Sequence, residues 1–219
     1  RILAGFEIVL ILATWPLWWR QGKFPTIPLV DSLALPLFAD QTVVCVFLAT
    51  CALITGRSGI RQWDKTVRVV SLVAALVLCV TSQQRVQAWH WLFVLGLSTS
   101  LFRPEHGMPL LRSVLASVYV CSGLSRMAPT AHQGMSAVIV DQLLVMSGIR
   151  IPMNGEGLPE LLCHVLNIGE LIVGVMLIWP GSRRWGILSA MALHVTLLVA
   201  LGPFGLRHNN AVLIWNLCC

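Results

Sequence analysis

Four polar side chains recur along the apolar segment 158–180. They are Glu160, His164, Asn167 and Glu170. At about 100° per residue of an α-helix, the first three fall within about 60° of one another, and Glu170 lies about 80° from Glu160. Ionisable groups at membrane depth are costly and face a bundle interior or a watery cavity. This polar stripe therefore indicates a ligand pocket or a proton path, or else interhelical hydrogen bonds that fix packing.

A metal site is a further interpretation of the same stripe. Glu160 and His164 are spaced i, i+4 and could share an ion, but two or three ligands on one helix are weak evidence for a metal. The seven cysteines include no C-x-x-C spacing and lie mostly in apolar stretches, which is typical of buried thiols. We predict no metal.

The next apolar segment, 185–202, carries small residues and one histidine at steps of four. The series is Ser182, Gly186, Ala190 and His194. Small residues at this spacing let two helices approach closely, so His194 is expected on a contact face. There it is either a structural hydrogen-bonding group or a functional partner of Glu170.

The segment 108–125 has a similar pattern, at steps of four and three. The series is Arg112, Ala116, Tyr119, Gly123 and Arg126, and Tyr119 is the only tyrosine of the chain. Arg126 ends the predicted helix. It is either an anchor at lipid headgroups or a donor to an anionic or carbonyl-bearing ligand.

Two tryptophans mark the predicted turn Gln83–Trp91. Trp89 and Trp91 fit an aromatic belt at the membrane surface, or they line the same ligand site. Glu7 is isolated in the first apolar segment, and we expect it to be paired or to reach the surface.

The composition specifies the elements that must position these residues. Of the 219 residues 57% are hydrophobic and 11% are charged, whereas soluble domains carry about 25% charged residues. The mean hydropathy is +0.80. These values exclude an ordinary cytosolic enzyme, a disordered protein and a disulfide-stapled secreted domain. They predict an all-α polytopic transmembrane bundle.

Apolar runs divide the chain into about seven expected spans, within a range of six to eight. They are 2–19, 36–56, 66–82, 86–102, 108–125, 158–180 and 185–202, with 209–219 as a candidate eighth. Polar residues interrupt the segment 133–148, which predicts an interfacial helix. We expect residues 1–219 to form one integral membrane domain.

The net charge of +6 is attributed to lipid headgroups and topology rather than to nucleic acid, because the chain has no basic run. With the N-terminus inside, nine of the 15 Lys and Arg residues fall on inner segments. This bias favours a cytoplasmic N-terminus and an outer position for the longer loops.

Several motifs resemble one family of small bacterial membrane proteins. The sequence SGLSRM at Ser122–Met127 resembles the S/A-G-x-x-K-L helix end of the DoxX-like and HTTM (vitamin K carboxylase-like) proteins. The Glu170 segment followed by the His194 segment is similar to their later helices. The sequences WPLWW, FPTIPLVD, QQRVQAWHW and GPFGLRHNNAVLIWN look like the same superfamily. The resemblance covers most of the chain and implies a membrane helical bundle of the bacterial inner membrane.

The resemblance also implies two activities. DoxX-like membrane subunits serve quinone-linked redox chemistry, and in the carboxylase the lysine of the corresponding motif is the base that activates vitamin K hydroquinone. Arg126 stands at that lysine position, and an arginine keeps its proton at ordinary pH. The resemblance therefore favours a bound quinone over carboxylation.

Our first hypothesis is a membrane subunit, with no enzymatic activity of its own, that binds a quinone-like or other lipophilic ligand near the outer face of a redox assembly. The candidate ligand-binding residues are Arg126, Glu170, His194, His164, Asn167, Tyr119 and Trp89. The alternatives are a structural subunit packed against partner helices, lipids or pigments, and a small transporter. Membrane lipids and other membrane subunits are the expected partners.

Overall fold

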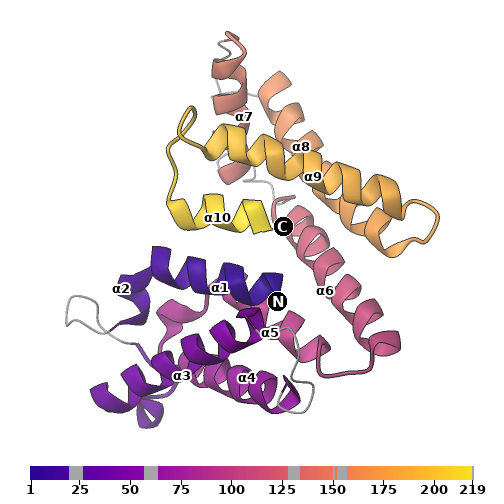
Figure 1. Ribbon diagram of the computed structural model, residues 1–219. Coiled ribbons are helices and arrows are strands. Elements are labelled where there is room, and N and C mark those ends of the chain that lie inside the picture. Colours follow the sequence, from indigo (N-terminus) through magenta and orange to yellow (C-terminus); the bar gives the residue numbers. More distant parts are fainter. Residues whose placement is uncertain (20–26, 57–63, 128–133, 150, 152–156, 219) are drawn as a thin grey trace. The chain divides into compact units, whose positions relative to one another are not determined.

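The computed structural model describes residues 1–19, 27–56, 64–127, 134–149, 151 and 157–218, and all regular elements within them are helices (Figure 1). The chain divides into two compact units, Arg1–Leu111 and Arg112–Leu217. The long α6 contributes its first part to the first unit and its last part to the second. Each unit is described by itself.

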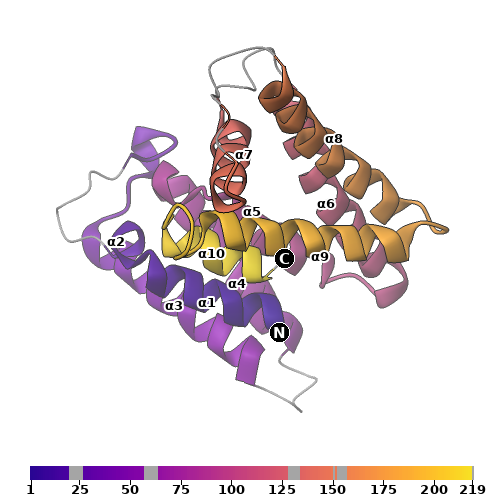
Figure 2. The ribbon, with the colours of Figure 1, turned by 90° about the horizontal axis from the view of Figure 1, so that it is seen from above.

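The first unit is built around the pair α3 and α4, against which α1 and α5 pack. Its elements are α1 (Ile2–Ala13), α2 (Trp15–Trp18), η1 (Asp31–Leu33), α3 (Leu37–Gly56), α4 (Asp64–Thr81), η2 (Gln83–Arg85) and α5 (Ala88–Thr99). Both views show α1 beside α3 (Figures 1 and 2). Residues 20–26, which include part of the FPTIPLVD motif, lie outside the described residues.

The expected first span, 2–19, is divided at Thr14. The pyrrolidine nitrogen of Pro16 cannot donate a helical hydrogen bond, and Thr14 leaves the helical conformation with φ −114° and ψ 25°. Its hydroxyl donates to Leu10 O at 2.7 Å and accepts the Trp18 indole N–H at 3.0 Å. α1 therefore extends for only about 18 Å, less than the hydrocarbon core of a bilayer.

Among the described residues, four helices are long and apolar enough to cross a membrane. They are α3, α6 (Pro104–Ser125), α8 (Leu158–Ile178) and α9 (Arg183–Leu201). These match four of the seven expected spans to within about four residues at each end. α4 has 18 residues but begins with charged side chains, and α5 has only 12. Their spanning, like that of α1, stays a prediction.

The second unit contains the end of α6 followed by α7 (Met135–Met146), α8, α9 and α10 (Asn210–Cys218). α7 lies within the segment 133–148 expected to be helical, and α7 and α9 both pack on α8. Ile139 of α7 joins Ala200 and Leu201 of α9 in a buried apolar cluster.

Glycines let the long helices of the second unit approach to backbone distance. A Cβ at Gly123 of α6 would lie 2.8 Å from Asn167 O, and one at Gly174 of α8 would lie 2.9 Å from Ala116 O. A Cβ at Gly186 of α9 would meet backbone atoms of α8 at 3.0 Å. The small-residue patterns therefore mark close helix contacts, as the sequence predicted.

Candidate functional site

An arginine–carboxylate pair joins α6 to α8 in the second unit. Arg126 Nη1 donates to Glu170 Oε1 at 2.6 Å, and Ser122 Oγ donates to Glu170 Oε2 at 2.6 Å. The Glu170 side chain is 4% exposed, whereas the Arg126 side chain is 31% exposed. The buried carboxylate is thus compensated by a guanidinium that itself reaches the surface of the unit.

Asn167 holds the backbone of Arg126, and Ser136 in turn holds Asn167. Asn167 of α8 is fully buried, and its Nδ2 donates to Arg126 O at 2.8 Å. Ser136 of α7 donates in turn to Asn167 Oδ1 at 2.7 Å. Because α6 ends one residue before Arg126, this amide satisfies a carbonyl that the helix leaves unpaired. Three helices therefore position one guanidinium.

A second polar chain connects α6, α9 and α10. Asn216 Nδ2 donates to Val212 O at 2.8 Å, which leaves Oδ1 facing His194 Nδ1 at 2.9 Å. An amide oxygen only accepts, so this arrangement places the hydrogen on Nδ1. His194 Nε2 then accepts from the Tyr119 hydroxyl at 2.7 Å.

Both polar groups lie on one face of α6. Tyr119, Ser122 and Arg126 are spaced i, i+3 and i+7, a spacing that aligns side chains along one face of a helix. From Tyr119 to Arg126 the helix rises about 10 Å. The end of α6 thus carries a hydroxyl–imidazole pair and, beyond it, an anchored guanidinium. We define the candidate site as Tyr119, Ser122, Arg126, Asn167, Glu170 and His194.

The polar stripe predicted for α8 divides into two parts. Asn167 and Glu170 are buried and belong to the site. Glu160 and His164, one turn nearer the helix start, are 38% and 42% exposed, and their side chains approach to 3.7 Å. The pairing at i, i+4 is therefore present, but this half of the stripe lies at the surface of the unit.

His194 and Trp89 also differ from their expected surroundings. The ring nitrogens of His194 contact Tyr119 and Asn216 rather than Glu170, whose oxygens are engaged by α6. Trp89 belongs to the first unit and is buried, with its ring 5.7 Å from that of Trp18.

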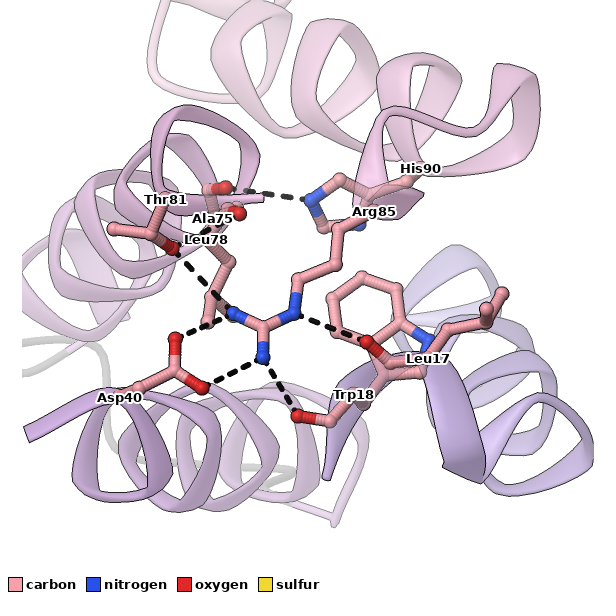
Figure 3. Close-up of polar contacts among 8 residues, drawn as sticks. All are labelled: Leu17, Trp18, Asp40, Ala75, Leu78, Thr81, Arg85 and His90. Carbon is pink, nitrogen blue, oxygen red and sulfur yellow. Dashed lines mark hydrogen bonds and ion pairs between the residues drawn. The ribbon is translucent and has the colours of Figure 1, made fainter. Parts of the chain in front are cut away.

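The first unit holds a second arginine–carboxylate pair, which sequence reasoning did not identify (Figure 3). Arg85 follows an expected span in the sequence, yet it is completely buried, and its two terminal nitrogens bind the two oxygens of Asp40 at 2.7 Å each. The remaining hydrogens go to Thr81 Oγ1 at 3.4 Å, Trp18 O at 2.8 Å and Leu17 O at 3.3 Å. All five guanidinium donors are used.

One sequence signal could have revealed this pair. Asp40 is the only charged residue in the apolar segment 36–56, and a lone carboxylate in such a segment needs a cationic partner. Arg85 follows the next expected span. When α4 packs against α3, Arg85 therefore lies at the same end of this helix pair as Asp40. The spacing by itself does not distinguish Arg85 from an arginine at the surface.

Glu7 is paired, one of the two outcomes expected for it. Its Oε1 lies 2.5 Å from His90 Nδ1 of α5, and both side chains are buried. The His90 ring is surrounded by the rings of Trp18, Phe47, Trp89 and Phe93, with centroids 5.0–6.4 Å away.

Comparison of the chain with protein-family models, curated proteins and solved structures finds no match. Within the described ranges, no group of three or more His, Cys, Asp or Glu side chains is arranged to hold a metal ion. The functional argument therefore depends on the geometry of the residues themselves.

Proposed function

We propose that this protein is an integral membrane subunit in which Arg126 binds the polar head of a lipophilic ligand, of the quinone-like class, within a redox assembly. The observation that carries the proposal is the guanidinium of Arg126, which is fixed by a buried carboxylate and yet 31% exposed. A guanidinium is a planar set of donors without an acceptor, so it suits carbonyl or anionic oxygens of a ligand.

The surroundings of Arg126 favour a ligand that is soluble in the membrane. Leu124 and Met127, its neighbours in the sequence, are exposed apolar side chains. Tyr119 extends the polar strip along the same face of α6 and supplies an aromatic ring. An apolar surface with a few fixed polar groups is the usual form of a small-molecule site.

The membrane, the number of spans and the orientation are proposed from the sequence patterns. We place the chain in the bacterial inner membrane as a seven-span bundle of the DoxX-like and HTTM type, with a cytoplasmic N-terminus. The four long apolar helices support the membrane setting, and α1, α4 and α5 would complete the spans. Carboxylation is not proposed, because Arg126 stands where the family motif has its lysine.

The test is gentle purification from native membranes, followed by mass spectrometry of the bound lipids and quinones and of copurifying proteins. Arg126→Leu is expected to lower ligand occupancy by about tenfold or more, because a charged hydrogen bond is lost. Arg103→Leu is the matched control, since its side chain is 83% exposed. Unchanged occupancy in Arg126→Leu contradicts the proposal.

The second candidate is a structural subunit of a larger complex. It is favoured by the fact that Asn167 and His194 hydrogen-bond between helices, as polar groups of membrane bundles commonly do. Glu170→Gln and His194→Ala separate the two functions. Under ligand binding, assembly stays intact while occupancy falls. Under a structural role, these variants either change nothing or disrupt the assembly.

A further inference from the structure

The buried pair of Glu7 and His90 in the first unit can be assigned a proton count. His90 Nε2 lies 3.4 Å from Ala75 O, and because a backbone carbonyl only accepts, this contact is a hydrogen bond in the tautomer that carries hydrogen on Nε2. His90 Nδ1 then either donates to an ionised Glu7 or accepts from a protonated one, across 2.5 Å. In both cases the pair holds one shared proton and has no net charge.

This neutral state fits the surroundings of the pair. Both side chains are buried among aromatic rings, and a net charge there would be costly. Two thiols also interact with the pair, Cys79 on α4 with His90 and Cys51 on α3 with Glu7. A thiol is a weak hydrogen-bonding group, so the proton is held mainly by the carboxyl and the imidazole.

A pocket of about 150 Å³ begins one helical turn from the pair. Ala4 precedes Glu7 by three residues on α1, Phe93 follows His90 by three on α5, and both side chains line the pocket. The volume is enough for several water molecules, each of which needs polar partners. The described residues that line the pocket all belong to the first unit, and the charged ones among them are Arg1, Asp64 and Arg68.

The rim of the pocket connects it to solvent. Arg68 pairs with Asp64, and Arg68 Nη1 donates to Ser100 O at 2.9 Å. The side chains of Arg68 and Asp64 are 30% and 46% exposed. These charged and carbonyl groups can bind the water that the apolar walls cannot.

On another side of the pair, the Trp18 indole lies between the His90 ring and the Arg85–Asp40 ion pair. The Trp18 indole lies 5.0 Å from the His90 ring and 5.9 Å from the Arg85 guanidinium carbon (Figure 3). Arg85 keeps its proton, and all its donors are bound. Because every Arg85 donor is bound within the first unit, Arg85 offers no hydrogen bond to water on this side, whereas the charged groups at the Asp64–Arg68 end of the pocket can bind water.

We propose that Glu7 and His90 form a proton-binding site in the first unit, loaded from the pocket at the Asp64–Arg68 end. In release, the shared proton passes to a water molecule of the pocket and leaves as hydronium, so the pair is left with one negative charge. In binding, hydronium returns the proton and restores the neutral pair, with no change in oxidation state. The site is independent of the ligand proposed at Arg126.

The test is NMR of the full chain in micelles with ¹⁵N-labelled histidine, in which His90 is identified by the signals lost in His90→Gln. We expect both ring nitrogens of His90 to report a proton, with a strongly downfield shared-proton signal. Glu7→Gln should remove that signal, while His194→Gln, in the other unit, should leave it. If Nε2 of His90 carries no hydrogen in the wild-type protein, the proposal is overturned, and this result requires no variant.

The route is tested by filling the pocket. Ala4→Leu is expected to slow solvent exchange of the shared proton by about tenfold, because exchange then requires local opening of the helices. Gly169→Ala is the control, since a Cβ there meets nothing within 4 Å. Exchange as fast in Ala4→Leu as in the wild type overturns the route. Arg126→Leu should alter neither measurement, which separates this site from the ligand site.

Discussion

Each unit of the molecule contains an arginine paired with a buried carboxylate, but the two arginines differ in what remains of their hydrogen-bonding capacity. Arg85 is fully buried and uses all five donors within the first unit. Arg126 holds Glu170 through one terminal nitrogen and is 31% exposed. An arginine–carboxylate pair is therefore not by itself evidence of a functional residue. The exposed fraction of the guanidinium distinguishes a structural arginine from a candidate binding group.

The largest expected effect is at Arg85. Arg85→Ala leaves Asp40 buried without its cation, which should lower the free energy of unfolding by about 3–5 kcal/mol. Equilibrium unfolding in mixed micelles measures this loss. A variant as stable as the wild type would show that the Arg85–Asp40 pair does not stabilise the first unit.

Arg126→Ala should lower the free energy of unfolding less, by about 1.5–3 kcal/mol, because Glu170 keeps its bond from Ser122 and the lost guanidinium is 31% exposed. The same unfolding measurement gives the comparison. If Arg126→Ala were as destabilising as Arg85→Ala, the distinction between a saturated and an open arginine would fail.

The rigidity of the helices that support Arg126 can be tested at Gly174. Gly174→Ala brings a Cβ to 2.9 Å from Ala116 O and should cost about 1–3 kcal/mol of unfolding free energy. Gly169→Ala, on the same helix in open space, should be neutral or stabilising by up to about 1 kcal/mol. Equal effects of the two substitutions would argue against close packing of α6 and α8.

A smaller effect is expected at Asn216. Asn216→Leu removes the acceptor of His194 Nδ1 and should cost about 0.5–1.5 kcal/mol. It should also move the ring hydrogen toward Nε2, which ¹⁵N NMR of labelled histidine detects. Retention of the hydrogen on Nδ1 in this variant would exclude Asn216 as the group that sets the tautomer.

The smallest effect is expected at the exposed end of the polar stripe. Glu160→Gln should change the unfolding free energy by less than about 0.5 kcal/mol, because Glu160 and His164 form an exposed pair at i, i+4. A loss of more than about 1 kcal/mol in the same micelles would assign Glu160 to the packed part of α8.

Helical periodicity located much of the second unit in advance. The spacing of Glu160, His164, Asn167 and Glu170 predicted one interior polar face, of which Asn167 and Glu170 are buried. The small residues predicted where α6, α8 and α9 approach. Arg126 was recognised because it ends a helix. The sequence did not predict that Glu170 would contact Arg126 rather than His194, since the relative rotation of two helices depends on packing between them.

The first unit was harder to predict. Glu7, Asp40 and Arg85 are single charges spread over three segments, so no periodic pattern connects them. Their pairing depends on contacts between residues 45 and 83 positions apart in the chain. The composition indicated that buried charges need partners, but which partner each charge has depends on the tertiary structure.

Because Asn216 fixes the tautomer of His194, that tautomer also reports how far the second unit has folded. His194 leaves the ribosome before Asn216, and until α10 docks no amide oxygen fixes the hydrogen on Nδ1. The position of one hydrogen atom thus reports whether the last helix of the second unit has docked. A nascent or misassembled chain could be distinguished from a mature one by this chemical signature, without a label on α10.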